Sequence, residues 1–443
     1  MELSFHKGNS PEVQWPRQSR FMRVLFISAN TERTNILPLP LGPAFVAAAT
    51  RRAGHEVILL NLMFEGNTNS AIQASIQKFR PEVIGISVRN IDDQNMADPK
   101  FLLPPVREVV AICRNLCGAP IVLGGAGYSI FPASALRYLG ADMGIQGEAE
   151  TVFPALLERL ARGASVDGLP NLYLPGQPAT ATTFARHLDD LPLPESALWI
   201  PNVSGKGELW IPVQGKRGCP MVCSFCSTKD IQGTTIRRRS PEALVSWMEG
   251  AVARGFRNFV FVDSTFNIPP SYAKNVCRAL IERRLHLNFW CIVYPKWVDG
   301  ELVELMEQAN CREVSLGFES ASDQMLKTYN KRFKAEEVRT ISRMLAGAGV
   351  RRTGFLLLGG PGETRESVEE SLAFADSLNI NALNITVGLR IYPATALAAT
   401  ALAEGMIRPD DDLLWPRFYL APQLSDWLPE RVAAYKTARS WVM

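Results

Sequence analysis

Two successive series of short β-rich runs, each alternating with helix-like segments, divide this chain of 443 residues. In the first series the strand-like runs are Arg23–Ser28, Val57–Leu60, Val83–Val88, Ile121–Leu123 and Met143–Ile145. Buried strands that alternate with helices predict an α/β domain with a doubly wound, Rossmann-like parallel sheet over about residues 21–160. In such a sheet, ligands bind beyond the carboxyl ends of the strands.

The second series begins at "ELWIPVQG" and continues at Phe259–Val262, Phe289–Tyr294, Glu313–Gly317, Phe355–Leu358 and Asn384–Gly388. Six β–α units of this length predict a partial, TIM-type (βα)6 barrel over residues 206–400, with its site at the carboxyl ends of the strands. Residues 161–205 are rich in Gly, Pro and Asp and predict a linker. Residues 1–20 predict a polar arm, and 401–443 a tail with a short helix.

Composition excludes several classes of protein. A net charge of +3 argues against a nucleic-acid protein held by bulk charge, so we expect no nucleic-acid partner. No apolar run reaches the length of a membrane span, and the first residues lack the apolar core of a signal peptide. We therefore expect a cytoplasmic protein whose eight cysteines are ligands, nucleophiles or core residues rather than disulfides. Outside the triad described next we expect core positions: Cys113, Cys117, Cys277, Cys291 and Cys311.

Three cysteines follow the first strand of the predicted barrel in the pattern C-x3-C-x2-C: Cys219, Cys223 and Cys226. A structural zinc site needs four ligands, and no second Cys or His pair follows. A redox C-x-x-C pair would leave Cys219 unused. Three thiolates fit a four-iron cluster in which one iron has no protein ligand. Zinc, redox and purely structural roles remain alternatives on spacing alone.

The triad, with Phe225 before its last cysteine, resembles the radical S-adenosylmethionine (radical SAM) superfamily, as does its place after the first strand of a six-unit barrel. The resemblance implies that "FVFVDSTFN" binds the methionine part of S-adenosylmethionine through Asp263, Ser264 and Thr265. It implies that "VSLGFES" holds the ribose through Glu319 and Ser320, for which a strand-end cap is the alternative. In "TGFLLLGGPGET", Leu357 and Gly359 would lie against the adenine, with Phe225 nearby.

In that superfamily the open iron chelates S-adenosylmethionine. An electron from an external donor of flavodoxin or ferredoxin type then cleaves a carbon–sulfur bond and yields a 5′-deoxyadenosyl radical. The resemblance therefore implies two cofactors for the barrel, a 4Fe–4S cluster and S-adenosylmethionine. The cofactors supply the difficult chemistry, and the protein orients them.

The first domain resembles the cobalamin-binding domain of one branch of the superfamily through "PLPLGPAF", "IGISVRNIDDQ", "IVLGGAGYS" and "GIQGEAE". The cobalamin-binding residues that this implies are Leu41, Gly42, Ser87, Arg89, Asn90, Gly124, Gly125, Gly127, Gly147 and Glu148. A plain tight turn is the alternative for the glycines at 124–127. The chain has no Asp-x-His-x-x-Gly motif, so we expect cobalt without a histidine ligand and with Arg89 or a water on its lower side.

These features together predict a cobalamin-dependent radical SAM enzyme, and most directly a C-methyltransferase acting on a small molecule or a peptide. A ring-forming enzyme, a non-radical cobalamin methyltransferase and a non-catalytic cobalamin or redox sensor are the alternatives. Arg89 and Tyr392 are the candidate catalytic residues, although Tyr392 could equally pack. We expect Arg237–Arg239 to be a solvated face, or else a contact for an anionic substrate or reductant. Asp92 and Asp93 predict a solvated loop, or a contact to a cobalamin amide.

Overall fold

The computed structural model describes residues 21–33, 36–200 and 208–443. The predicted arm at 1–20 lies outside these ranges, as do the last five residues of the predicted linker. Within the described ranges, no helix combines the length and the apolar character that a membrane crossing requires.

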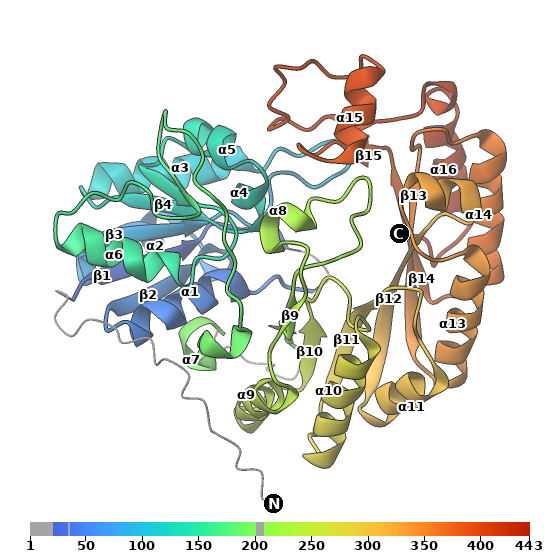
Figure 1. The fold of residues 1–443 in the computed structure, drawn as a ribbon, viewed down its shortest axis with the longest axis horizontal. Coiled ribbons are helices and arrows are strands. Elements are labelled where there is room, and N and C mark those ends of the chain that lie inside the picture. The colour runs from blue at the N-terminus through green and yellow to red at the C-terminus, as the bar shows by residue number, and fades with distance from the viewer. Residues whose placement is uncertain (1–20, 34–35, 201–207) are drawn as a thin grey trace, which may run out of the picture.

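The first domain is built on a six-stranded sheet with the strand order β2-β1-β3-β4-β5-β6 (Figure 1). Its strands are β1 (Arg23–Ser28), β2 (Glu56–Asn61), β3 (Val83–Ser87), β4 (Ile121–Gly124), β5 (Met143–Ile145) and β6 (Leu172–Tyr173). Strands β1 to β5 pair in parallel, which confirms the predicted sheet. Its helices are α1 (Leu41–Arg52), α2 (Thr68–Phe79), α3 (Leu103–Leu116), α4 (Ala126–Ile130), α5 (Pro132–Leu139) and α6 (Val152–Ala161), with the 3-10 turn η1 (Leu62–Phe64).

The continuous apolar runs of this domain reflect burial on both faces of the sheet. Val24, Leu25, Phe26 and Ile27 are successive residues of β1, and each is at most 4% exposed. Parallel strands covered by helices on both faces have this pattern instead of alternation. The linker contains one strand that sequence did not predict: β6 pairs antiparallel with β5. A strand of two residues is too short for the sequence to show an alternation of buried and exposed side chains.

The second domain is an all-parallel sheet in the order β14-β13-β12-β11-β10-β7, which confirms the six predicted units. The strands are β7 (Trp210–Val213), β10 (Asn258–Phe261), β11 (Asn288–Val293), β12 (Cys311–Glu319), β13 (Arg351–Leu358) and β14 (Ala382–Val387). The helices between them are α9 (Pro241–Ala253), α10 (Pro270–Glu282), α11 (Gly300–Gln308), α12 (Asp323–Thr328), α13 (Ala335–Gly347) and α14 (Arg365–Ser377). Strands β7 and β14 do not pair with each other, so the barrel stays open.

Shorter elements join and cap the domains. The linker carries η2 (Leu188–Asp190) and α7 (Ser196–Trp199), and the cysteine segment carries β8 (Lys216–Arg217), α8 (Thr228–Gln232) and β9 (Arg237–Arg238). The last part of the chain adds β15 (Leu389–Arg390), α15 (Ala396–Ala403), β16 (Phe418–Tyr419), η3 (Pro422–Leu424) and α16 (Leu428–Thr437). Helix α16 confirms the predicted helix of the tail.

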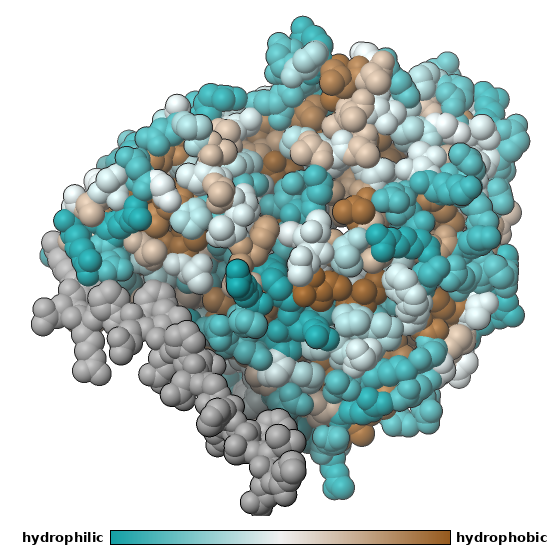
Figure 2. All heavy atoms as spheres, in the orientation of Figure 1, coloured by the Kyte–Doolittle hydropathy of each residue, from teal (hydrophilic) through white to brown (hydrophobic). Residues whose placement is uncertain are grey.

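The two domains lie side by side, and β10 is the labelled barrel strand nearest to the first domain (Figure 1). Strand β7 is the edge strand beyond β10. Hydrophilic side chains cover most of the face in Figure 2, and apolar side chains gather near its top, over α15. Leu402 of this helix is 42% exposed. Helix α15 follows the last barrel strand, so this apolar area borders the mouth of the barrel.

Candidate cofactor and active site

A cavity of about 600 Å³ lies between the two domains. Its walls come from the carboxyl ends of the first-domain strands and from the first four barrel strands, including Pro212, Phe261, Trp290 and Ser315. A volume of this size is typical of small-molecule and cofactor sites, which often form between domains.

Eight of the ten residues predicted to bind cobalamin line this cavity: Leu41, Gly42, Ser87, Arg89, Gly124, Gly125, Gly147 and Glu148. Asn90 instead lines a small hollow behind Arg89. Gly127 packs α4 against the loop after β3, because an added Cβ would lie 3.0 Å from the Asn90 carbonyl carbon. The structure therefore brings most of the predicted set to one cavity and places these two residues beside it.

The wall of the cavity contains bare backbone at the turn after β4. Gly125 has a φ of +102°, and an added Cβ would lie 2.5 Å from the Val88 carbonyl oxygen. Only glycine fits such a position without strain. At Gly42 an added Cβ would meet nothing within 4 Å and would project into free space. The turn itself thus requires Gly125, which is the alternative given for these glycines, whereas Gly42 leaves space for a bulky ligand.

Arg89 is the cationic side chain at the ligand end of β3. It lines both the main cavity and the small hollow, and burial lowers the pKa of its guanidinium. The residue is exposed to the cavity, but the surrounding protein removes part of the hydration of its guanidinium, and this loss lowers the pKa. Among the described residues it forms no ion pair. His55 cannot serve the cavity, because its Nδ1 accepts the Met22 amide at 3.3 Å at the amino ends of β1 and β2, whereas the cavity lies at the carboxyl ends of the strands.

The cysteine triad lies on a loop closed at its base by the β8–β9 hairpin, in which Lys216 pairs with Arg238 and Arg217 with Arg237. Gly218 has a φ of +88°, and a Cβ there would lie 2.1 Å from the Thr235 carbonyl oxygen. Glycine is therefore required where the loop leaves the hairpin. The loop from Gly218 to Ile236 is called the cluster loop below.

Cys219, Cys223 and Cys226 are half-buried, free thiols. Burial raises the pKa of Cys219 and of Cys223. The charge of Cys226 adds to both shifts and that of Cys219 adds to the shift of Cys223, against the opposing charge of Lys331, so the three sulfurs share one neighbourhood. Among the described residues, no three His, Cys, Asp or Glu side chains converge on a single metal ion. In a four-iron cluster each thiolate binds a different iron, so the donor set fits a cluster better than one zinc ion.

Asp263, predicted to bind the methionine, is turned inward and is 1% exposed. Its Oδ1 accepts the amide hydrogens of Gly215 and Lys216 at 2.8 and 3.1 Å. Burial raises the pKa of Asp263 to about 6, although Lys216 opposes the shift. The carboxylate thus fixes the backbone that leads into the β8–β9 hairpin. Ser264 and Thr265, which follow it, are partly exposed at the end of β10.

Glu319 ends β12 with a φ of +60°, and its Oε1 accepts Lys331 Nζ at 2.9 Å. Burial works against the charge on Lys331, but Glu319 and then Cys223 more than offset it, so the pKa of Lys331 is raised. Ser320 is fully buried, and its hydroxyl bonds to the Ser371 hydroxyl and to the Ser322 amide. The structure gives Ser320 the strand-end role that was the alternative to ribose binding.

The segment predicted to contact the adenine lies at the carboxyl end of β13. Leu357 is partly exposed on β13, and its carbonyl accepts the Tyr329 hydroxyl at 3.0 Å. Gly359 has a φ of +97° and donates its amide to Glu363. Phe225 meets Tyr329 edge to face, with ring centroids 5.6 Å apart. Phe225 and Leu357 therefore both border Tyr329.

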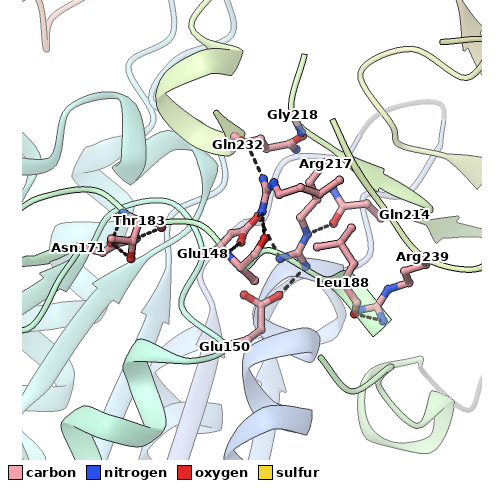
Figure 3. A network of polar contacts seen from close by, with 12 residues as sticks. Glu148, Glu150, Asn171, Thr183, Leu188, Gln214, Arg217, Gly218, Gln232 and Arg239 are labelled. Atoms are coloured by element: carbon pink, nitrogen blue, oxygen red, sulfur yellow. Dashed lines mark hydrogen bonds and ion pairs between the residues drawn. The ribbon is translucent and has the colours of Figure 1, made fainter. Parts of the chain in front are cut away.

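A buried polar network joins the cluster loop to the first domain (Figure 3). Arg217 contacts Glu150 at 2.5 Å and Glu148 at 3.5 Å, and all three side chains are at most 7% exposed. Arg237 adds a second contact to Glu148 at 2.5 Å. Burial opposes ionisation of Glu150, but Arg217 more than compensates and lowers its pKa. Charges at the end of β5 thus hold the base of the cluster loop.

Two predictions of solvated charge are wrong in part, because Arg238 and Asp93 are exposed as predicted but their neighbours are not. Arg237 and Arg239 are buried: the first binds Glu148, and the second donates to the carbonyls of Leu188 and Leu191. Asp92 is 4% exposed and pairs with Arg390 at 2.8 Å, which ties the loop after β3 to β15. In both cases the buried residue binds a group that lies far away in the sequence, which the local pattern of charges does not reveal. The core assignment of Cys113, Cys277, Cys291 and Cys311 is confirmed, and Cys117 is partly buried.

Tyr392 sits where the domains and the cluster loop meet. Its ring centroid lies 6.1 Å from that of Phe131 and 5.2 Å from the Arg390 guanidinium carbon. Burial, followed by the charge of Asp92, raises its pKa, and Cys226 is among the groups that act on it. The neighbouring residues hold the cluster loop: Leu397 donates to the Ser224 carbonyl and Lys229 to that of Ala394.

Sequence reasoning missed three charged groups at the site: Glu150, Arg217 and Lys331. Arg217 directly precedes the cysteine segment, and Glu150 follows the end of β5 by a few residues. The signal in the sequence was an acid after β5 and a base after β7, because the carboxyl ends of both strands face the ligand site. Lys331 lies in an irregular stretch, where no periodic pattern indicates burial.

Two family models match the chain. The model of the radical SAM superfamily matches residues 213–375, and that of the B12 binding domain matches residues 37–157. Tryptophan 2-C-methyltransferase of Streptomyces laurentii is 25% identical over 86% of this chain and 74% of that protein. An uncharacterized methyltransferase of Pyrococcus horikoshii is 26% identical over 83% of this chain and 79% of its own length.

A solved structure has a similar fold throughout. The radical S-adenosylmethionine methyltransferase TsrM from Kitasatospora setae, with cobalamin and a [4Fe-4S] cluster bound, superposes with a TM-score of 0.85. The match has 22% sequence identity and covers 96% of this chain and 93% of that one. The pairing of the two domains, as well as each domain, is therefore shared.

Proposed function

Because the chain belongs to the radical SAM superfamily and carries its B12 binding domain, we propose that it is a cobalamin-dependent radical SAM methyltransferase that methylates carbon. The observation that carries the proposal is the cavity between the domains, whose walls combine the predicted cobalamin residues with the first barrel strands. When bound, S-adenosylmethionine, a 4Fe–4S cluster and cobalamin supply methyl transfer and radical chemistry.

The chain's own residues would hold these groups at two adjoining places. Cys219, Cys223 and Cys226 would ligate the cluster, leaving one iron for S-adenosylmethionine. Ser264, Thr265 and Glu319 would face the methionine and ribose parts, and Phe225, Leu357 and Gly359 the adenine. The first-domain set, from Leu41 to Glu148, would hold cobalamin in the cavity.

Arg89 would face the lower side of cobalt in place of a histidine. A guanidinium remains protonated and cannot ligate a metal, so it would keep that face weakly coordinated and favour release of a methyl group. Replacing Arg89 with Lys or Ala should therefore shift the cobalamin absorbance spectrum and slow turnover. Unchanged spectra and turnover in both variants would remove Arg89 from the account.

Tyr392 would orient substrate at the junction of the domains. Its ring packs near Phe131 and the Arg390 guanidinium, and its hydroxyl would bond to the substrate. We take the substrate to be a small molecule or a peptide that enters near α15, where apolar side chains gather (Figure 2). The relatives' printed names include tryptophan as a methylated compound, and an indole would suit this apolar border.

The proposal includes an external one-electron donor and a cytoplasmic location. All eight cysteines are free, which suits a reducing compartment. The function is tested by incubating the reconstituted enzyme with candidate substrates and deuterated S-adenosylmethionine. Methylated product, 5′-deoxyadenosine and S-adenosylhomocysteine are measured together. Methylation with both by-products supports the proposal. A rearranged product without the label, or label transfer without 5′-deoxyadenosine, would replace it by the cyclase or the non-radical alternative.

A further inference from the structure

The cluster loop exposes an apolar side chain next to one of the triad's cysteines. Val222 directly precedes Cys223 and is 46% exposed, whereas Met221 beside it is 3% exposed. Trp297, in the loop after β11, is 45% exposed. Both have left-handed backbones, with φ of 41° and 55°. Such a conformation is an outlier for β-branched and bulky residues and is kept where a function requires it.

Printed contacts connect Val222 and Trp297 into one surface. The Asn330 side-chain amide donates to the Val222 carbonyl at 2.9 Å, and Arg332 Nη2 donates to the Pro220 carbonyl at 3.3 Å. The Arg332 amide donates to the Tyr294 hydroxyl at 2.8 Å. The Tyr294 ring stacks on Trp297 with centroids 6.3 Å apart. The segment after α12 therefore bridges the two exposed apolar side chains.

The same segment of the chain carries positive charge without an ion-pair partner among the described residues. Lys327, Arg332 and Lys334 are exposed, and none of them forms an ion pair with any residue that the structure describes. The acidic groups that follow are neutralised: Glu336 pairs with Arg339 and Arg343, and Glu337 with Lys296. We call Val222, Trp297, Lys327, Arg332 and Lys334 the cluster-loop face. Asp323, at the start of α12, is also exposed.

We propose that the cluster-loop face is the docking surface for a small acidic electron-carrier protein of flavodoxin or ferredoxin type. The inference rests on the proposed function, because that reaction needs an external electron. One electron leaves the carrier, which is oxidised, and enters the cluster at the triad, with no bond made or broken. An apolar centre with a charged border is the usual composition of a transient docking surface, and the positive charge steers an acidic partner.

The rest of the chain's basic and aromatic surface is less suited to this task. Of the three arginines that sequence offered for a reductant contact, Arg237 and Arg239 are buried. Arg238 is exposed, and its guanidinium carbon lies 5.9 Å from the centroid of the Tyr272 ring. Trp415 is 56% exposed but stacks on Phe101 at 4.0 Å, in the first domain. The cluster-loop face borders a predicted ligand, since Val222 and Cys223 are adjacent in the chain.

The test measures binding of oxidised bacterial flavodoxin and, separately, of a bacterial ferredoxin to the reconstituted enzyme by titration calorimetry at low and high salt. The test variant is Lys327→Glu/Lys334→Glu, which leaves Arg332 and its contact to the loop intact. The matched control, Lys78→Glu/Lys100→Glu, makes the same change in net charge at exposed lysines of the first domain.

We expect salt-sensitive binding of a carrier that the test variant weakens at least roughly tenfold and the control changes less than about twofold. Absence of saturable binding of both carriers, or equal loss in test and control, would overturn the inference. Cluster reduction and turnover with dithionite, which needs no docking, should be normal in the test variant. If the unmodified enzyme shows no turnover with dithionite, that result counts against the proposed function. The binding measurement still tests the docking surface, because it does not depend on turnover.

Discussion

Arg217 and Glu150 form a buried ion pair across the boundary between the two domains, with the guanidinium 2.5 Å from the carboxylate (Figure 3). Arg217 belongs to the hairpin at the base of the cluster loop, and Glu150 follows the last parallel strand of the first domain. The pair therefore fixes the position of the cysteine triad relative to the cavity.

Removing one partner should destabilise the protein strongly. Glu150→Gln leaves Arg217 buried with a weakened set of partners, and we expect a loss of about 3 kcal/mol in the free energy of unfolding. The double variant Glu150→Gln/Arg217→Met should lose less, because no uncompensated charge remains. Urea denaturation of the apoprotein measures both. The control is Glu158→Gln, which breaks the exposed pair with Arg162 and should change stability by less than about 1 kcal/mol. Similar losses for Glu150→Gln and Glu158→Gln would show that the interdomain pair contributes little.

Each triad cysteine should be required for iron. Replacing Cys219, Cys223 or Cys226 with Ala removes a thiolate ligand, so anaerobic reconstitution should yield at most a small fraction of the normal iron and sulfide. Cys117→Ala, at a partly buried cysteine of the first domain, is the control and should keep both. Full iron content in any triad variant, measured by metal and sulfide analysis, would remove that cysteine from the ligand set.

Filling the bare wall of the cavity should exclude cobalamin without unfolding the apoprotein. Gly42→Leu adds a side chain where a Cβ meets nothing within 4 Å, so the fold accepts it but the ligand space shrinks. We expect at least roughly tenfold less bound cobalamin by absorbance, with the melting temperature of the apoprotein little changed. Gly66→Leu makes the same substitution at another position without neighbours, outside the cavity. Normal cobalamin content in Gly42→Leu would place the cofactor elsewhere.

Glu363 should make stability fall as pH rises. Burial raises its pKa from the ordinary 4.5 to about 7, despite amide hydrogens from Gly359 and Gly360. Between these values the folded state keeps a proton that the unfolded state has released, so unfolding becomes easier with increasing pH, by up to about 3 kcal/mol. Glu363→Gln has no such proton and should be relatively more stable at pH 7.5 than at pH 5. Identical pH dependence of urea unfolding in the two proteins would contradict the shift.

The fold could be predicted from sequence because buried parallel strands are continuous apolar runs, such as Val24–Ile27. The cysteine triad could be predicted because its spacing is local. The partners of Arg217, Arg237 and Asp92 could not, because Glu148, Glu150 and Arg390 are distant in the chain and only the tertiary fold brings them together. Ser320 followed the motif in sequence, yet its hydroxyl turns to Ser371. Side-chain direction at a strand end depends on the helix packed behind it.

The central claim is that this chain transfers a methyl group from S-adenosylmethionine to cobalamin held in the interdomain cavity. The most direct measurement requires no knowledge of the substrate. The reconstituted enzyme is reduced, supplied with cobalamin and methyl-deuterated S-adenosylmethionine, and analysed by mass spectrometry. The account predicts bound cobalamin that carries the deuterated methyl group and an equal amount of S-adenosylhomocysteine, both lost in Gly42→Leu. Cobalamin that binds but remains unlabelled, with no S-adenosylhomocysteine formed, would contradict it.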